Sequence, residues 1–314
     1  MEQRELGNSG VELPIVGFGC GPNAQLMVGD DEELRLETIR LAMDSGITYF
    51  DTAYAYGWGI SETNLGRALK ELGIHPSIST KFCLQPEDLK DPRSAVLKGF
   101  EENLERLGVE SVDVLLSHNR IALHHEDGEI LNVGALLDLN DVFGKNGVAV
   151  ALQELMEAKV IRTTGFTSYG GDPAAVSEAL GSGVFGSINA SFSLLNPSAG
   201  VTVPEGYEDK DFKKVISTAQ ENNVGVMAIQ VLGRGILAAD PTDDARINRL
   251  RAFAAAHDES MVSTAIRYVT TKPGVTTAIL GLSQPQHVQD AVDAIARGHY
   301  SDAEMDELEA AALS

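Results

Sequence analysis

The sequence predicts an α/β fold: a (β/α)8 TIM barrel with an N-terminal β-hairpin and long βα loops at the C-terminal face. Short apolar runs alternate with segments of helical period, as in a parallel sheet covered by helices, and eight such units follow one another along the 314 residues. No repeat, low-complexity tract or linker divides the chain. We therefore expect a single barrel domain over residues 1–314.

Eight strands and eight helices are expected in alternation, because eight units of this kind close into a barrel rather than an open sheet. The strands are recognised by their apolar runs: IVGFG from Ile15, ITYFD from Ile47, SISTKF from Ser77, VDVLLSH from Val112, VIRTTGF from Val160, GSINA from Gly186, VGVMAI from Val224 and VTTAIL from Val275. The helices follow them and begin at Glu32, Ser61, Pro92, Val148, Asp172, Asp211, Glu259 and Pro285.

Further elements flank and interrupt these units. In ELGNSGVELP an Asn-Ser-Gly turn predicts a hairpin that would close the bottom of the barrel, and Asp302 to Leu313 would form a last helix on its outside. Three connections are too long for plain βα loops: residues 119–147, 192–210 and 230–257. All three follow the C-terminal ends of strands, where barrels carry their active sites.

The net charge of −22 argues against nucleic-acid or anionic-membrane partners, because its long-range field would repel phosphate. It fits either adaptation to a salty cell interior or an ordinary soluble acidic protein. No apolar run reaches the roughly 18 residues that span a bilayer, and MEQRELGNSG lacks the features of a signal peptide, so we expect a cytoplasmic location.

Two cysteines, Cys20 and Cys83, do not suggest a disulfide framework. At the ends of the first and third strands they would stand about 9.6 Å apart, which is too far for a disulfide bond. We expect both thiols to be buried and reduced.

Four side chains at strand ends could converge on one spot. Asp51, Lys81 and His118 end three successive predicted strands on one alternating face, and they are the topmost inward residues if that face points into the barrel. Tyr56 lies five residues after Asp51 on the following loop and can lean over them.

This arrangement suits carbonyl reduction, in which a phenol gives a proton to the carbonyl oxygen while a hydride arrives at the carbon. Lys81 would favour the phenolate of Tyr56, Asp51 would keep the lysine charged, and His118 would hydrogen-bond the carbonyl oxygen. Singly, these residues could be a helix cap, packing, a surface lysine and a core histidine. Their common order, spacing and strand-end positions favour a shared site.

The same segments resemble a known family. RELGNSGVELPIVGFGCG looks like the opening hairpin and first strand of the aldo-keto reductases, and FDTAYAYGWGISETNLGRAL closely matches their signature. The resemblance extends over nearly the whole chain. It implies that Asp51, Tyr56, Lys81 and His118 form the catalytic tetrad of that family.

The resemblance also implies where a nicotinamide cofactor would bind. Thr167 and Ser168 in TGFTS, and Asn189 in GSINASF, stand where the family contacts the carboxamide. Leu232 and Arg234, in LGRG, resemble part of the loop that wraps the pyrophosphate. No GxGxxG motif suggests a Rossmann site instead.

Two segments depart from the family's usual pattern, the second of them from members selective for NADPH. Ile229 stands where many members stack a tyrosine on the nicotinamide ring. Leu280 to Ala291 has no Lys or Arg for a 2′-phosphate; Gly281 and Ser283 offer close approach and a hydroxyl, and His287 stands near the usual arginine. We expect NADP(H) or NAD(H) as cofactor, with weak discrimination.

Substrate-facing residues are expected beside the tetrad. Trp58, the single tryptophan, would form a pocket wall. Asn119 and Arg120 follow the histidine of the tetrad, and a basic group there could bind an anionic or polyhydroxy substrate; alternatively Arg120 belongs to a solvated loop or an internal ion pair. His124 and His125 lack the partner spacing of a metal site, so none is expected.

The sequence thus predicts a nicotinamide-dependent oxidoreductase that reduces an aldehyde or ketone to an alcohol, with Tyr56 as general acid and a small-molecule carbonyl or sugar as substrate. Two alternatives stay open: an aldose dehydrogenase that oxidises a sugar hemiacetal with Tyr56 as base, and a non-catalytic nicotinamide-binding regulatory subunit. The sequence leaves the substrate, the direction and the oligomeric state undecided.

Overall fold

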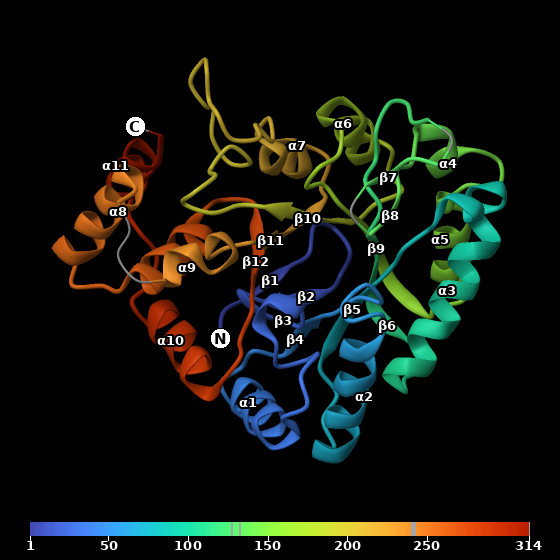
Figure 1. Ribbon diagram of the computed structural model, residues 1–314, viewed down its shortest axis with the longest axis horizontal. Coiled ribbons are helices and arrows are strands. Elements are labelled where there is room, and N and C mark those ends of the chain that lie inside the picture. Colours follow the sequence, from blue (N-terminus) through green and yellow to red (C-terminus); the bar gives the residue numbers. More distant parts are fainter. Residues whose placement is uncertain (127, 132, 240–242, 314) are drawn as a thin grey trace.

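The computed structural model describes every residue except 127, 132, 240–242 and 314. Eight parallel strands form a closed barrel ringed by helices (Figure 1), as the sequence predicts. In order around the barrel they are β3 (Val16–Gly19), β4 (Tyr49–Asp51), β5 (Ser77–Phe82), β6 (Val112–Ser117), β9 (Ile161–Thr167), β10 (Ser187–Ser191), β11 (Gly225–Ile229) and β12 (Val275–Leu280), which pairs with β3.

Each expected helix is present between the strands. They are α1 (Glu32–Asp44), α2 (Ile60–Leu72), α3 (Pro92–Leu107), α5 (Val148–Glu157), α6 (Pro173–Gly181), α7 (Val215–Glu221), α9 (Met261–Thr271) and α10 (Pro285–Ala296). One start is wrong: α7 begins at Val215 rather than Asp211. Lys213 and Lys214 both have a φ of 53°, which places them in the left-handed region and keeps a right-handed helix from starting earlier.

The N-terminal hairpin closes the barrel at the N-terminal ends of the strands, as predicted. It pairs β1 (Gln3–Glu5) with β2 (Glu12–Pro14) and crosses the middle of the barrel in Figure 1. Its apolar side chains are fully buried and join an interior cluster with residues from the strands: Leu6, Val11, Leu13, Tyr49, Val114, Leu116, Met227 and Ile279. The barrel is therefore a packed core and not a pore.

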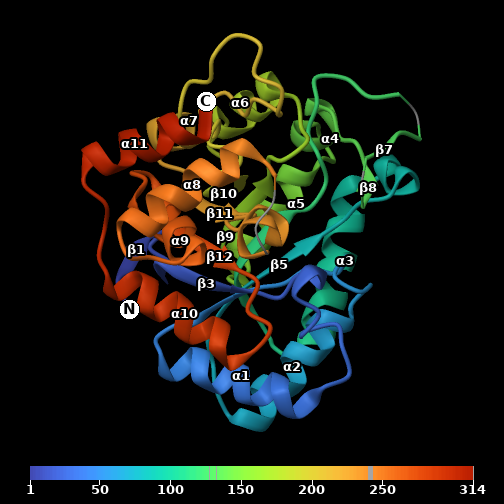
Figure 2. The same ribbon diagram turned by 60° about the vertical axis from the view of Figure 1, so that its left-hand side comes forward.

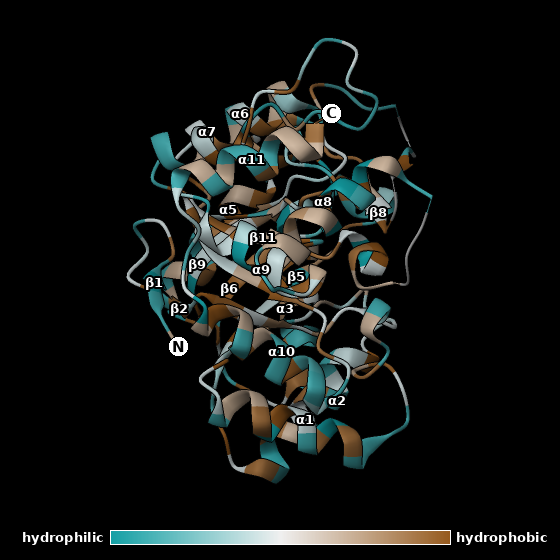
Figure 3. Ribbon diagram, turned by 90° about the vertical axis from the view of Figure 1, so that its left-hand side faces the viewer, coloured by the Kyte–Doolittle hydropathy of each residue, from teal (hydrophilic) through white to brown (hydrophobic). Residues whose placement is uncertain are grey.

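A second and larger apolar core lies between the strands and the surrounding helices. Figure 3 shows hydrophobic colouring concentrated inside and hydrophilic colouring along the outer helices. Since both faces of the sheet are covered, the strands read as nearly continuous buried runs.

The long connections contain secondary structure of their own. Residues 119–147 contain a small hairpin, β7 (Ile130–Leu131) and β8 (Gly134–Ala135), and the helix α4 (Leu139–Phe143). Single turns of 3-10 helix, η1 (Pro22–Ala24) and η2 (Pro86–Lys90), follow β3 and β5.

The connection 230–257, too long for a plain βα loop, contains η3 (Gly233–Ala238) and a helix that the sequence analysis did not expect, α8 (Ala245–Ala256). Ile247, Leu250 and Phe253 are buried at helical spacing on α8. This face packs toward α11 (Asp302–Leu313), the predicted outer helix, which lies beside α8 in both Figure 1 and Figure 2.

Both cysteines are free, and Cys20 is buried as expected. The expectation fails for Cys83, which is partly exposed and donates its S–H to the carbonyl of Val133, 3.1 Å away. Within the described part of the chain, no helix is both long and apolar enough to cross a bilayer.

Gly66 allows α2 to approach α3 closely, because a β-carbon there would stand 2.3 Å from the carbonyl oxygen of Leu107. We expect Gly66→Ala to destabilise the fold by about 1–3 kcal/mol through this overlap, although alanine is the better helix former. Gly99 on α3 is the matched control: a β-carbon added there would have nothing within 4 Å, so Gly99→Ala should stabilise by roughly 0.5–1 kcal/mol. Chemical denaturation measures both, and equal effects at the two sites would contradict the packing argument.

Candidate active site

A buried ion pair joins the ends of β4 and β5. Lys81 is fully buried, and its Nζ lies 2.8 Å from Asp51 Oδ2 and 2.9 Å from Oδ1. The ammonium also donates to the carbonyl oxygen of Thr52 at 2.8 Å. The parallel pairing of β4 with β5 brings the two charged residues to the same end of the barrel.

Side chains inside the barrel orient the carboxylate of this pair. Ser79 donates from Oγ to Asp51 Oδ1 at 2.7 Å, and Tyr49 donates from its hydroxyl to Ser79 Oγ at 2.7 Å. Both donors share the inward face of their strands with the charged residue at the top. The sequence analysis did not predict this series of hydrogen bonds, although the alternation pattern places Ser79 below Lys81.

Tyr56 lies on the loop between β4 and α2, with its hydroxyl oxygen 3.3 Å from Lys81 Nζ. Burial raises the pKa of Tyr56 to about 12, while the neighbouring charge of Lys81 acts in the opposite direction. The phenol is therefore protonated near neutral pH. Burial alone would lower the pKa of Lys81, but the charge of Asp51 raises it above its ordinary value, so the lysine is a cation.

His118 follows β6 directly and is 3% exposed. Its ring lies edge-on to that of Tyr56, with centroids 5.6 Å apart and planes at 85°. Burial, together with the charges of Lys81 and Arg120, holds the pKa of His118 well below 6.5. The imidazole is thus neutral at neutral pH, and its Nδ1 has no hydrogen-bond partner among the described residues.

A second buried polar network fixes α2 behind the site. Glu62 is fully buried and accepts hydrogen bonds from Thr80 at 2.5 Å, Asn103 at 2.6 Å and Arg106 at 2.6 Å. These contacts tie α2 to β5 and α3. Burial raises the pKa of Glu62 despite the three donors. Sequence reasoning missed the network because its members stand on three separate elements.

At the ends of β9 and β10 the described residues leave one buried hydrogen-bond acceptor without a donor. Thr167 donates to the carbonyl of His118 at 3.2 Å, and Ser168 donates to the carbonyl of Asn189 at 3.2 Å. The side-chain Oδ1 of Asn189 is buried and has no partner among the described residues. Since an unsatisfied buried acceptor costs about 1–3 kcal/mol, this oxygen suits a ligand that brings N–H donors, such as a carboxamide.

The comparison with known proteins agrees with this geometry. Residues 17–313 match the sequence model of the Aldo/keto reductase family. The chain belongs to this family. It is accordingly an NAD(P)H-dependent oxidoreductase.

Relatives of this aldo-keto reductase match over most of its length. Aldo-keto reductase YhdN of Bacillus subtilis is 24% identical, covering 92% of this chain and 87% of its own. L-galactose dehydrogenase of Arabidopsis thaliana is 25% identical, covering 94% and 88%. The holo form of an aldo-keto reductase from Bacillus halodurans has the same fold, with a TM-score of 0.76, 20% identity and coverage of 99% and 96%.

The remaining cofactor candidates of this aldo-keto reductase lie beyond β11 and β12. Ile229 ends β11 and packs on the interior cluster. Leu232 precedes η3, where Arg234 has a φ of 60° and an exposed side chain. Past β12, Ser283 Oγ lies 3.0 Å from Nδ1 of His287, so these two polar groups satisfy each other. Gly281, next to β12, is exposed.

The predicted substrate residues have three different environments. Trp58 is 65% exposed, has a φ of 55° and meets only the edge of Tyr54 among the described rings. Asn119 is buried, and its amide bonds the backbone N–H and C=O of Leu84 and the carbonyl of Ala135. Arg120 is 1% exposed, so it does not belong to a solvated loop.

The sequence analysis expected no metal site and did not identify one cluster of possible metal ligands. His125, Asp138 and Asp141 place their ligand atoms within 4.8 Å of one another. His125 Nε2 lies 2.8 Å from Asp141 Oδ2, and the two carboxylates form the capping box of α4. The cap and the ion pair account for this cluster without a ligand.

Nucleotide preference can be predicted from the absence of Lys and Arg in residues 280–291. A 2′-phosphate normally gains charge-assisted bonds of about 1.5–3 kcal/mol each, and this segment supplies none from such residues. We expect fluorescence titration to give less than about 100-fold preference for NADPH. Lys272, which could otherwise reach across, is paired with Glu309 at 2.9 Å.

A gain-of-function variant sharpens this test. His287→Arg should strengthen NADPH binding by roughly tenfold while leaving NADH nearly unchanged. Arg234→Gln is the control, since Arg234 is the other basic residue proposed to contact the nucleotide. A large loss of NADPH affinity in Arg234→Gln would place the phosphate beside η3 instead.

Proposed function

We propose that this protein reduces an aldehyde or ketone to an alcohol, with Asp51, Tyr56, Lys81 and His118 as the catalytic residues. The observation that carries the proposal is the hydroxyl of Tyr56, 3.3 Å from a buried ammonium, on a ring that packs at right angles to a neutral imidazole. A proton donor, a cation that stabilises the resulting anion and a neutral hydrogen-bond donor are the groups that carbonyl reduction requires.

The charge states support Tyr56 as the acid. Its pKa of about 12 keeps the proton on the phenol until a carbonyl oxygen gains charge. The proton then passes from Tyr56 to that oxygen, and Lys81 stabilises the phenolate that remains. His118, being neutral, can donate a hydrogen bond to the same oxygen without competing as a stronger acid.

A nicotinamide cofactor would supply the hydride when bound. Ser168 and the free Oδ1 of Asn189 are the groups proposed to hold its carboxamide, with Thr167 beside them. Ile229 would pack on the ring face. Leu232, Arg234, Gly281, Ser283 and His287 are proposed for the rest of the nucleotide, and Trp58 for a wall of the substrate pocket.

Tyr56→Phe tests the proposal directly. We expect carbonyl reduction to fall by roughly 10²–10⁴-fold, because the hydroxyl acts in the transition state, while nucleotide affinity stays within a few-fold. Tyr54→Phe on the same loop is the matched control and should keep its activity. If Tyr56→Phe retained more than about a tenth of wild-type turnover, another group would be the acid.

A second candidate is the reverse reaction, an aldose dehydrogenase that oxidises a sugar hemiacetal with Tyr56 as base. The lack of Lys and Arg in residues 280–291 favours it, because catabolic oxidation commonly uses NAD. One relative, from Arabidopsis thaliana, is named L-galactose dehydrogenase. A regulatory nicotinamide-binding subunit would instead bind nucleotide and turn over slowly with every carbonyl.

The two directions should differ in their pH dependence. Oxidation needs the phenolate of Tyr56, whose population grows about tenfold per pH unit below a pKa of about 12. Reduction needs the phenol, which stays protonated at any pH well below this pKa of about 12. Single-turnover rates between about pH 6 and about pH 9 should therefore rise steeply for oxidation and stay nearly flat for reduction. A flat profile for oxidation would show that Tyr56 is not the base.

The setting of this activity is part of the proposal. We propose that residues 1–314 act as one domain in the cytoplasm, on a small-molecule carbonyl or sugar. Given the net charge of −22, nucleic acid is not proposed as a partner.

A further inference from the structure

Arg120 is a buried cation without a counter-charge. It is 1% exposed, and in the described part of the chain no carboxylate lies within 4 Å of its guanidinium. Nη1 donates to the carbonyl of His118 at 3.1 Å, whereas Nε is buried and finds no hydrogen-bond partner in the described part of the chain. Burying an unpaired charge costs free energy, so this side chain would be stabilised by a bound anion.

The loop after β9 is built around this guanidinium. The ring of Tyr169 lies 3.7 Å from Arg120 Cζ, in stacking contact. Gly170 has a φ of 96°, and a β-carbon there would stand 2.7 Å from Arg120 Nε. Glycine is thus needed at 170 both for the backbone conformation and for the close passage of the arginine.

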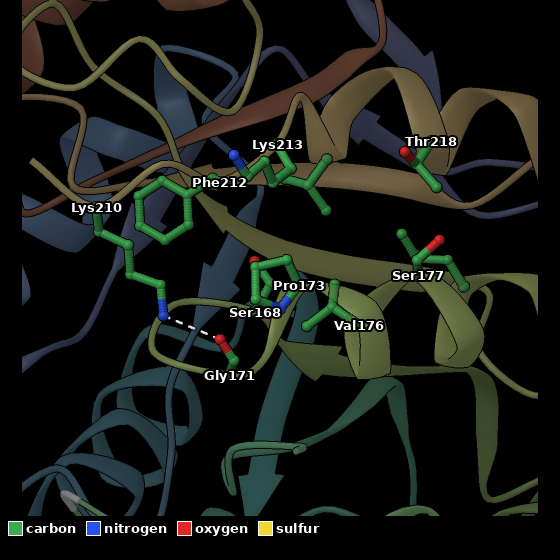
Figure 4. A pocket seen from close by; sticks show the side chains of 11 residues that line it. Ser168, Gly171, Pro173, Val176, Ser177, Lys210, Phe212, Lys213 and Thr218 are labelled. Carbon is green, nitrogen blue, oxygen red and sulfur yellow. Dashed lines mark hydrogen bonds between the residues drawn. The ribbon is translucent and has the colours of Figure 1, made fainter. Parts of the chain in front are cut away.

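A second cation meets the same turn from a distant part of the sequence. Lys210, from the connection after β10, donates from Nζ to the carbonyl of Gly171 at 2.9 Å (Figure 4). Among the described residues, Lys210 also has no carboxylate within 4 Å. Together with Ser168, Gly171 and Phe212 it lines a cavity of about 120 Å³ that extends between α6 and α7 and that Arg120 does not line. Burial and the charge of Arg120 lower the pKa of Lys210. Two cations therefore converge on one turn of a strongly acidic protein.

Arg120, one member of this pair, borders the proposed reacting groups and lies away from residues 280–291. Arg120 bonds the backbone of His118, and Tyr169 is near enough to Tyr56 to contribute to its raised pKa. In the barrel order β6 stands four strands from β12, on the opposite side. Residues 280–291, proposed for the nucleotide, follow β12. An anion between Arg120 and Lys210 would thus belong to the substrate.

We propose that Arg120 and Lys210 bind a carboxylate or phosphate carried by the substrate on the same molecule as its reacting carbonyl. The guanidinium presents Nε without a partner for a directional bond, and the lysine adds a mobile point charge. The inference rests on the proposed carbonyl reduction and names its substrate class as anionic carbonyl compounds.

Matched substrate pairs test the proposal. 4-Oxobutanoate is compared with butanal, and glyceraldehyde 3-phosphate with glyceraldehyde, at constant ionic strength. We expect kcat/KM to favour the charged member of one pair by roughly ten- to 100-fold, and the favoured pair identifies carboxylate or phosphate. Wild-type enzyme that prefers the neutral member of both pairs would overturn the proposal.

The variants are judged by the ratio of charged to neutral kcat/KM, because any general loss of activity cancels. Arg120→Gln should bring the ratio near one, Arg120→Lys should restore part of it, and Lys210→Gln should lower it several-fold. Lys98→Gln, which removes a charge from the exposed face of α3, should leave it unchanged. An unaltered ratio in both Arg120→Gln and Lys210→Gln would contradict the assignment.

A binding measurement separates this inference from the proposed activity. Succinate and inorganic phosphate, each compared with chloride at equal ionic strength, should raise the melting temperature of the wild type, and Lys210→Gln should reduce the shift. If no carbonyl is reduced but the anion shift is present, the proposed activity fails and the anion site stands. If carbonyls are reduced but neither anion shifts the melt, the site is wrong.

Discussion

The buried ion pair between Lys81 and Asp51 is the interaction on which the candidate site depends. Both charges have left water, so each is stable only because the other is in contact and because Ser79 and the carbonyl of Thr52 complete their hydrogen bonds. The closed barrel supplies the fixed strand register that this geometry needs. Without the carboxylate, burial would push the lysine toward its neutral form, and Tyr56 would lose the adjacent cation.

The protonation states around this pair follow from one low-dielectric environment acting on different groups. Burial raises the pKa of the Tyr56 phenol and lowers that of the His118 imidazole, so both are neutral near pH 7, while the lysine remains charged. The charge of Lys81 thus lies beside two neutral hydrogen-bonding side chains. This distribution favours a reaction in which negative charge develops on an oxygen bonded to both.

The local charge at the top of the barrel differs in sign from that of the whole molecule. The net charge is −22, yet Lys81 and Arg120 both lie near His118, and Lys210 lies near Arg120. Interactions between buried groups are screened much less than those between surface charges. A bound anion would therefore experience the nearby cations more strongly than the acidic exterior.

Much of this protein is determined by local sequence patterns. Apolar runs in alternation with helical segments predict the eight strands and helices, because strand and helix periodicities bury different sets of residues. The positions of Asp51, Lys81 and His118 at strand ends predict that they meet, since the ends of parallel strands share one edge. Misplaced features, such as the start of α7 and the helix α8, depend on backbone φ at Lys214 and on packing against α11.

Only the tertiary structure decides the contacts between side chains that are far apart in sequence. Glu62 meets Asn103, Arg120 stacks on Tyr169, and Lys210 reaches the turn at Gly171 because several loops fold over the barrel together. Such contacts produce no periodic pattern in the sequence, because each depends on the rotamer of one side chain and on the conformation of one loop. The sequence by itself determined the barrel and the candidate catalytic residues at its strand ends, whose spacing is set by regular strands. The burial of Arg120, and the absence among the described residues of a counter-charge for it and of a donor for Asn189 Oδ1, were decided only by packing, because burial and hydrogen-bond satisfaction belong to the folded surroundings of a residue.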